Sequence, residues 1–315
     1  MKKVVITGAT GAIGRALIKI CIDAGYEVLT VVHRTSSRAD ELEGIKGCSV
    51  LRLDLNEYDQ AMDEMENQGI EISGYELFFH LAWMAPFGKD RDNLDLQLEN
   101  VKASLAAVRF ARDLGCSSFI GTGSQAEYGR VEGILSSDTP TFPETGYGIA
   151  KLCTGQLTRL ACDQLGLRHI WCRVLSVFGP YDREQTLIST AVTKMMANAE
   201  TEFTWCDQMW DYIYSEDAAR AILLAGQKGE NGKVYMIGSG EVHSLKEYIK
   251  KIAEITGYAK EIGFGKRPYN DKQVMYLQAD ISSLSNIGFH IECSFEEGIK
   301  HFINYISNSN GEQCD

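Results

Sequence analysis

The chain has 315 residues, a hydrophobic content of 44% and a formal net charge of −12, so we expect a soluble globular protein with one large core and a smaller appended lobe. An acidic chain repels the phosphate backbone of nucleic acids and anionic membrane surfaces, and we expect neither as a partner. The nine cysteines lack the spacing of metal ligands, which predicts no bound metal and free thiols in a reducing compartment, the cytoplasm.

The first half of the chain alternates short β-branched runs with longer helical patterns. Predicted strands are residues 4–7, 28–32, 49–53, 77–81, 119–122 and 169–175. Predicted helices between them are residues 13–24, 93–114 and 147–165. This alternation is typical of a doubly wound parallel sheet. The predicted fold class is therefore α/β, with residues 1–175 forming a dinucleotide-binding domain of the Rossmann type.

The first predicted strand runs directly into a glycine-rich turn that opens a helix. Backbone N–H groups and the helix dipole at such a turn can hold a pyrophosphate. A glycine triplet alone is weak support, since any tight turn can use one, but its position at the start of a βαβ unit predicts dinucleotide binding. The residues expected at the cofactor here are Gly8, Thr10, Gly11, Ala12, Ile13 and Gly14.

Basic residues follow the second predicted strand, where NAD enzymes usually carry an acidic residue for the ribose 2′-hydroxyl. His33 and Arg34 stand there and Arg38 follows, and guanidinium groups suit a 2′-phosphate better. We expect NADP(H) to be preferred and NAD(H) to be possible, because both arginines could instead be solvated loop charges. Asp54 and Leu55, after the third strand, are expected at the adenine edge.

Three residues form the predicted catalytic set. Tyr147 and Lys151 lie four residues apart at the start of a predicted helix, which places both side chains on one face. A neighbouring ammonium lowers the pKa of a tyrosine, so Tyr147 can exchange a proton with an alcohol or ketone. Ser124 follows the fifth predicted strand, at the sheet edge where ligands of open α/β folds bind, and can polarise a substrate carbonyl.

The alternation weakens after Gly179 and Pro180. Residues 218–225, 245–255 and 295–306 are predicted helices, and residues 233–237 are a predicted strand. We expect residues 176–315 to form mainly a smaller α/β substrate-binding lobe, with a segment near residues 210–228 returning to the first domain.

Several segments together resemble the extended short-chain dehydrogenase/reductases, the NAD-dependent epimerase/dehydratase family, in family order and over most of the chain. The matching segments are TGATGAIG at residues 7–14, Asp54-Leu55, HLA at 80–82, Asn100, GSQAEYG at 123–129, YGIAK at 147–151, RVLSVFGP at 173–180 and WDYIYSEDAARA at 210–221. The resemblance implies that Tyr147 is the acid–base residue, that Lys151 contacts the nicotinamide ribose, and that Ser124 binds the reacting oxygen. It also implies cofactor contacts at Leu81, Ala82 and Asn100.

The family's substrates are mostly nucleotide sugars, and three reactions must be separated. The 4,6-dehydratases carry an acidic pair where this chain has Gln125 and Ala126, which cannot support elimination of water. Reductase is preferred to epimerase because Arg34 and Arg38 indicate a cofactor that is supplied reduced, and the chain is most similar to bacterial nucleotide-sugar 4-ketoreductases. A redox sensor that binds NADP without catalysis is the non-enzymatic alternative.

Fewer residues point to the substrate. Gln125 and Arg267 are expected to contact it, although Arg267 could equally lie in an exposed basic turn. The chain departs from many family members at Trp210, where an arginine often meets the substrate phosphates, and at Ser176, where an asparagine is common. The resemblance also implies a homodimer formed through the helices at residues 93–114 and 147–165.

Overall fold

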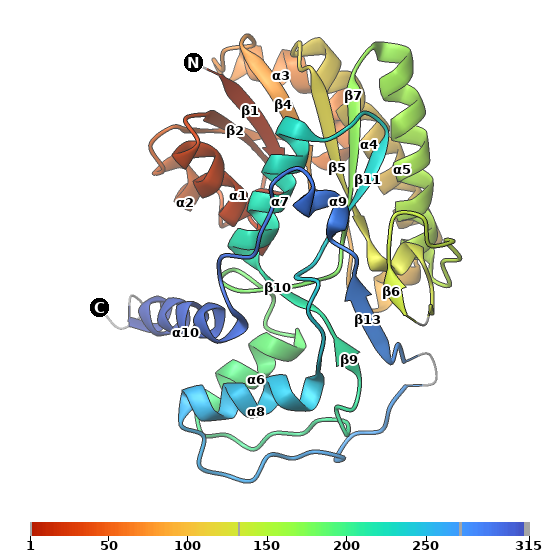
Figure 1. The fold of residues 1–315 in the computed structure, drawn as a ribbon. Helices are drawn as coiled ribbons and strands as arrows, with labels where there is room; N and C mark the ends of the chain where they lie inside the picture. Colours follow the sequence, from red (N-terminus) through yellow and green to blue (C-terminus); the bar gives the residue numbers. More distant parts are fainter. Residues whose placement is uncertain (1, 132, 271–272, 312–315) are drawn as a thin grey trace.

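Seven parallel strands form the central sheet of the computed structural model, which describes residues 2–131, 133–270 and 273–311 (Figure 1). In spatial order they are β11 (Lys233–Ile237), β7 (Arg168–Val174), β5 (Ser118–Ser124), β4 (Tyr75–His80), β1 (Lys3–Thr7), β2 (Glu27–Val32) and β3 (Cys48–Arg52). The order reverses direction between β1 and β4, so a crevice opens at their carboxyl ends. The predicted doubly wound α/β fold is confirmed.

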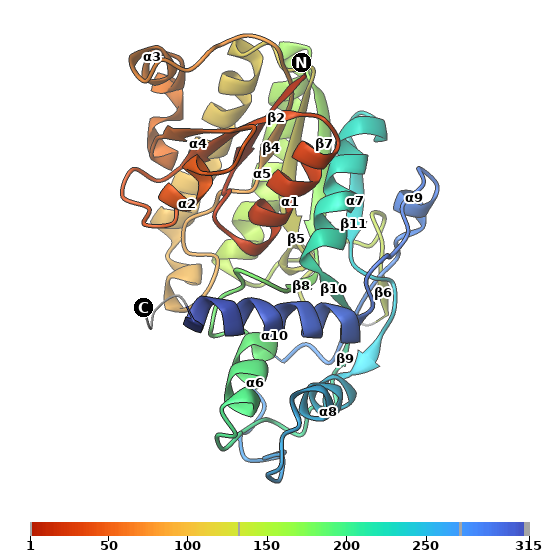
Figure 2. The same cartoon turned by 90° about the vertical axis from the view of Figure 1, so that its left-hand side faces the viewer.

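Helices cover both faces of this sheet (Figure 2). On one face lie α1 (Ala12–Asp23) and α7 (Ser215–Lys228), which pack against Val4 and Ile6 of β1. On the other lie α4 (Leu94–Asp113) and α5 (Gly146–Leu165), in the cluster that contains Val5. A strand with apolar β-branched residues on both faces is stable only when both are covered. Among the described helices, none combines the length and apolar character needed to cross a membrane.

One predicted strand belongs to a different part of the fold from that expected. Residues 233–237 were expected in the lobe, but β11 pairs in parallel with β7 at the edge of the central sheet. Tyr235 and Ile237 are fully buried there because α7 brings the chain back across the sheet before β11 begins. The long helix α7 is the returning segment, and it begins five residues later than the expected residue 210.

The carboxyl ends of the strands face a smaller lobe (Figure 1). Its helices are α6 (Leu187–Met196), α8 (Leu245–Thr256) and α10 (Phe295–Gly311), which share a core around Phe178, Ile249 and Ile299. Short strands connect the two parts: β8 (Ser176–Phe178) with β10 (Tyr212–Tyr214), and β12 (His243–Ser244), β9 (Met209–Trp210), β13 (Tyr276–Ala279) and β6 (Ile134–Leu135). These strands of two to four residues carry too little periodicity to be predicted.

Short elements complete the sheet domain. They are the helices α2 (Asp40–Glu43), α3 (Ala61–Asn67) and α9 (Ser282–Ser285), and the short 3-10 helices η1 (Leu55–Gln60), η2 (Lys89–Asp92) and η3 (Gln125–Glu127). All six lie in segments that the hydrophobic pattern left without an assignment. Three of them, η1, η2 and η3, carry residues that border the candidate site.

Candidate active site

The glycine-rich turn between β1 and α1 forms one wall of the crevice. A Cβ at Gly8 would lie 2.7 Å from the backbone of Ala82, and one at Gly14 would overlap the carbonyl oxygen of Gly8. A Cβ at Gly11 would meet only that carbonyl, at 3.8 Å. Gly8 and Gly14 are therefore required by chain packing, whereas Gly11 leaves an open approach to the start of α1, where no side chain caps the helix. This is the arrangement in which a helix N-terminus can receive a phosphate group.

The opposite wall is the segment that follows β4. The Thr7 hydroxyl accepts hydrogen bonds from the N–H groups of Leu81 and Ala82, each at 3.2 Å. Asn100 is fully buried, and its Oδ1 accepts the N–H of Met84 at 2.7 Å while its Nδ2 donates to the Met84 carbonyl at 3.0 Å. Asn100 thus fixes the backbone of this wall through Met84.

At the far end of the crevice, the two predicted arginines differ. Arg34 Nε donates to Glu57 at 2.8 Å and an Arg34 terminal nitrogen lies 3.4 Å from Glu64, so its charge is already paired. Arg38 is exposed and donates to the carbonyl of Thr10 at 3.3 Å, beside the glycine-rich turn. Of the two, Arg38 is the guanidinium that a bound anion can reach without breaking an ion pair.

Carboxylates near this end hold the loops. Asp54 Oδ1 accepts the backbone N–H of Arg34 at 2.9 Å and lies 3.5 Å from His33 Nε2. Asp54 and Glu57 also form a reciprocal capping box that begins η1 at Leu55. These contacts place His33, Arg34, Asp54 and Leu55 together at the carboxyl ends of β2 and β3.

The predicted catalytic residues converge at the end of β5. Thr145 caps α5 by accepting the N–H of Gly148 at 3.1 Å, and a Cβ at Gly148 would overlap the Ala126 carbonyl oxygen. The first turn of α5 therefore lies directly against η3, which follows Ser124. Lys151 Nζ donates to the Thr122 carbonyl at 2.8 Å and lies 5.9 Å from the centre of the Tyr147 ring.

Burial is the largest influence on the pKa values of Tyr147 and Lys151. It raises the pKa of Tyr147, while a hydrogen bond with Ser124 and the charge of Arg91 act in the opposite direction. Burial also lowers the pKa of Lys151 to about 7, an effect opposed by the Glu127 carboxylate. The Lys151 ammonium lies 3.8 Å from the centre of the Trp83 ring, which favours its charged form. Lys151 therefore loses its proton more readily than an exposed lysine does.

A buried ion pair beneath Ser124 was not among the predicted site residues. Glu127 is fully buried, accepts the backbone N–H of Ser124 at 2.8 Å and pairs with Arg173 Nε at 2.7 Å. Trp171 Nε1 donates to the same carboxylate at 3.1 Å, and Arg173 also donates to the Tyr128 hydroxyl at 2.7 Å. The sequence signal was one charged residue in each of two otherwise uncharged segments, residues 123–129 and 173–180.

The predicted substrate residues are separated. Gln125 begins η3 next to Ser124, whereas Arg267 lies on an exposed part of the lobe, 3.4 Å from Glu202. Trp210 and Ser176, the two departures from the family pattern, contact each other: Trp210 Nε1 donates to Ser176 Oγ at 2.8 Å. The two changes therefore form one hydrogen-bonded unit between β9 and β8.

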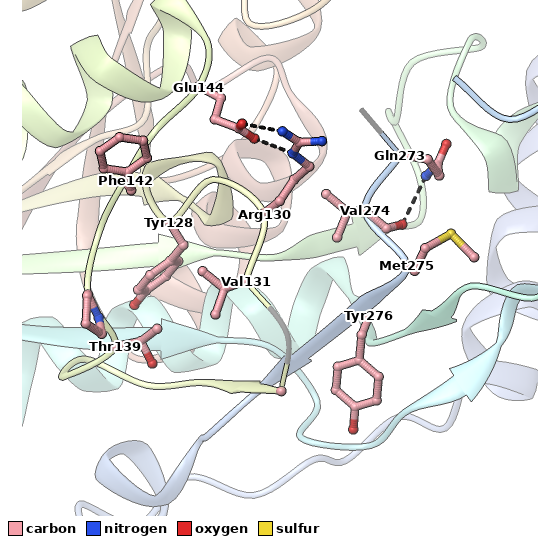
Figure 3. Close-up of a pocket in the computed structure, with 12 residues that line it drawn as sticks. Tyr128, Arg130, Val131, Thr139, Phe142, Glu144, Gln273, Val274, Met275 and Tyr276 are labelled. Carbon is pink, nitrogen blue, oxygen red and sulfur yellow. Dashed lines mark hydrogen bonds and ion pairs between the residues drawn. The ribbon is translucent and has the colours of Figure 1, made fainter. Parts of the chain in front are cut away.

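A pocket of about 900 Å³ lies beside this region (Figure 3). Its walls come from the segment between Tyr128 and Glu144 and from Gln273 to Tyr276 of the lobe. Arg130 and Glu144 form a two-pronged ion pair at 2.6 and 2.7 Å, so the charges in its wall are matched. Ser124, Tyr147 and Lys151 do not line it. The predicted catalytic set therefore rests on the chemistry of its side chains and not on a large cavity.

Comparisons with known proteins agree with this fold. The profile described as "NAD dependent epimerase/dehydratase family" matches residues 4–238. The CDP-abequose synthase of Salmonella muenchen is 24% identical over 310 residues, covering 96% of this chain and 97% of that protein. The dTDP-4-dehydro-6-deoxyglucose reductase of Escherichia coli is 24% identical over 311 residues, covering 96% and 97%. The crystal structure of a UDP-glucose 4-epimerase from Thermotoga maritima with UDP-glucose superimposes with a TM-score of 0.86 at 24% identity, covering 98% of this chain and 99% of that one.

The buried Glu127–Arg173 pair gives a stability prediction. Glu127→Gln should lower the free energy of unfolding by about 3–5 kcal/mol, because it leaves the Arg173 charge buried without a counter-ion. The exposed pair of Arg109 and Asp59, 2.8 Å apart, provides the control, and Asp59→Asn should cost less than about 1 kcal/mol. Urea unfolding followed by circular dichroism measures both. Equal losses for the two variants would contradict the prediction.

Proposed function

Because the chain belongs to the NAD-dependent epimerase/dehydratase family, which it matches over residues 4–238, we propose that it reduces the 4-keto group of a nucleotide-activated 6-deoxyhexose with NADPH. Family membership makes it an NAD(P)-dependent enzyme of the oxidoreductase and epimerase type. The observation that carries the proposal is the convergence of Tyr147, Lys151 and Ser124 beside Gln125 and Ala126. This set can move a proton to or from an oxygen but has no acidic pair for dehydration.

The crevice fits a nicotinamide dinucleotide. The open approach at Gly11 and the uncapped start of α1 suit its pyrophosphate. Gly8, Thr10, Ala12, Ile13 and Gly14 complete that turn. We propose further contacts at the adenosine end from His33, Arg34, Arg38, Asp54 and Leu55, and from Leu81, Ala82 and Asn100 along the second wall. When bound, the cofactor supplies the hydride.

The residues of the chain then carry the proton. Tyr147 donates its phenol proton to the oxygen of the ketone, so the product is the secondary alcohol. The Ser124 hydroxyl hydrogen-bonds Tyr147 and its oxygen accepts the N–H of Ala126 at 3.2 Å, so a bound ketone oxygen beside Tyr147 can accept the Ser124 proton in turn. Lys151, held by the Thr122 carbonyl, stabilises the resulting tyrosinate and orients the nicotinamide ribose.

We propose that the lobe, mainly residues 176–315, holds the nucleotide sugar. Gln125 lies beside Ser124 at the sugar end, and Arg267 lies on the lobe. The paired Trp210 and Ser176 offer an indole and a hydroxyl where many family members carry charge and an amide. Recognition of the phosphates therefore depends on other cations of this chain.

The preference for NADPH rests on Arg38. Its guanidinium is exposed beside Thr10, and His33, which follows β2, is not acidic. Arg34 contributes less, because Glu57 and Glu64 already pair with it. A 2′-phosphate gains a charge-assisted hydrogen bond from a free guanidinium that a ribose hydroxyl does not.

Epimerisation is the second candidate function. The Thermotoga maritima epimerase structure superimposes along nearly the whole chain, and the same tyrosine, lysine and serine chemistry serves a reaction in which hydride leaves and returns. The two candidates differ in whether the cofactor is consumed. A redox sensor would not need these three catalytic side chains, so this is the least supported of the three candidate functions.

We also propose a homodimer through α4 and α5. Leucine and isoleucine side chains are exposed along both helices, at Leu94, Leu98, Ile149, Leu157 and Leu160. Apolar residues that recur on two adjacent helices are typical of a surface covered by a second subunit.

Replacement of the tyrosine tests the catalytic assignment. Tyr147→Phe should lower turnover of a nucleotide 4-ketosugar by about a hundredfold or more, because the proton donor is lost. Affinity for NADPH, measured by calorimetry, should stay near the wild-type value. Tyr26→Phe, at the opposite end of the sheet where its hydroxyl meets Gln227, is the control and should be fully active. Unchanged turnover in the Tyr147 variant would remove this residue from the mechanism.

Cofactor preference is tested with two arginine variants. The wild-type protein should bind NADPH more tightly than NADH, and Arg38→Ala should weaken NADPH binding by about tenfold or more while leaving NADH binding unchanged. Arg34→Ala should have a smaller effect. Arg112→Ala, at the far end of α4, controls for net charge. Tighter binding of NADH by the wild-type protein, in calorimetric titration, would refute the preference.

The reaction itself is tested by supplying substrates of two kinds. CDP- and dTDP-linked 4-keto-6-deoxyhexoses should oxidise one NADPH for each alcohol formed, as read by absorbance and by NMR of the product. UDP-, CDP- and dTDP-hexoses should not lose water, because Gln125 and Ala126 supply no acid or base. They should not change configuration either, because a cofactor that is supplied reduced cannot take a hydride from the hexose. Epimerisation of a hexose without net consumption of cofactor would favour the second candidate instead.

A further inference from the structure

A second cation lies against Tyr147 and has no role in the proposed reaction so far. Arg91 belongs to η2, between β4 and α4. Its Cζ lies 4.6 Å from the centre of the Tyr147 ring, closer than the 5.9 Å of Lys151 Nζ. A guanidinium within about 6 Å of a ring centroid is attracted by its π electrons. By distance, Arg91 is the nearer of the two charges to this ring.

A hydrogen bond and close packing hold η2 against the start of α5. The Asp92 carboxylate accepts the N–H of Gly146 at 2.7 Å. A Cβ at Gly146 would lie 3.4 Å from Asp92 Cα and 3.5 Å from the Arg91 carbonyl oxygen. Asp92 follows Arg91 in the chain and Gly146 precedes Tyr147, so this hydrogen bond joins the neighbours of the two residues in contact. This fixes Arg91 relative to Tyr147 independently of the stacking contact itself.

The Arg91 side chain forms few stabilising polar contacts with the rest of the protein. Its Nε is buried and has no hydrogen-bond partner among the described residues. Burying an arginine nitrogen without an acceptor disfavours folding. Stability alone therefore does not account for an arginine at this position, whereas a favourable interaction with a negatively charged group beside it would.

We propose that Arg91 is a positioning residue that stabilises the ionised form of Tyr147 alongside Lys151. The proposal rests on the proposed role of Tyr147 as proton donor. A phenol that gives up its proton becomes an anion, and a fixed positive charge beside the ring favours that anion. Arg91 thereby makes Tyr147 a stronger acid during reduction.

Four groups face Tyr147, each from a different element or turn. Arg91 of η2 and Lys151 of α5 favour the tyrosinate, Ser124 of β5 supports it by a hydrogen bond, and Glu127 of η3 opposes it. Burial lowers the pKa of Lys151 to about 7, so this lysine loses its charge as the pH rises past neutrality. Arginine stays protonated throughout this range. Tyr147 therefore keeps one permanent positive neighbour when Lys151 becomes neutral.

The test measures the ionisation of Tyr147 directly. The full-length protein is labelled with ¹³C at the tyrosine ring carbon that bears the hydroxyl, and Tyr147→Phe assigns the signal. The signal is followed by NMR from pH 6 to 11, with and without NADP⁺. Arg91→Gln should raise the Tyr147 pKa by about one unit, a tenfold loss of acidity. Arg91→Lys, which keeps the charge, should restore at least half of this shift.

Lys89→Gln is the matched control, because Lys89 is an exposed cation on the same turn and should leave the Tyr147 signal unchanged. A shift as large as that of Arg91→Gln in this control would overturn the proposal, as would a pKa in Arg91→Gln within 0.2 of wild type. The proposal would also be overturned if the Tyr147 signal of the wild type did not titrate by pH 11.

Melting temperatures are recorded for every variant. Loss of folding in both Arg91→Gln and Arg91→Met would show that Arg91 has a structural role, and it would also overturn the proposal. Since no sugar substrate is used, the result stands even if the reductase assay fails.

Discussion

The close approach of α5 to the end of β5 is the constraint on which the candidate site depends. Gly148 allows the first turn of the helix to contact the Ala126 carbonyl, and Lys151 reaches back to the Thr122 carbonyl at 2.8 Å. Any larger residue at position 148 would push Tyr147 and Lys151 away from Ser124. The chemistry is therefore set by backbone packing, and the side chains act from positions that the helix and the strand have already fixed.

The sequence allowed the sheet to be predicted because each long element carries its own periodic signal. Strands such as β1 are short apolar runs, here followed by Gly8, and α4 and α5 each span 20 residues with caps at their first turns. The position of β11 could not be predicted, because nothing within residues 233–237 says which strand they pair with. Arg91 and Glu127 were missed for a similar reason: each acquires its importance from a partner, Tyr147 or Ser124, that only the tertiary structure brings close.

The candidate site carries positive charges, although the net charge of the whole molecule is negative. A chain of net charge −12 repels anions at long range, yet Arg38, Arg91 and Lys151 border the crevice, and cations fixed in this way favour negative charge there. The buried carboxylate beneath Ser124, that of Glu127, is paired with Arg173 at 2.7 Å. Local pairing and fixed cations thus decide the chemistry, while the overall charge affects only the approach of ligands.

The path of the chain after β7 has a consequence for how such enzymes can be recombined. The chain enters the lobe at α6, returns to the sheet through α7 and β11, enters the lobe again at α8, and passes α9, beside β11, before α10 ends in the lobe. The lobe is therefore not a contiguous module, and no single cut releases it as a folded unit. A chimera that borrows the lobe of a relative needs several junctions in register. Point changes in the lobe, such as a change of the Trp210–Ser176 pair, avoid this requirement, whereas exchange of whole segments does not.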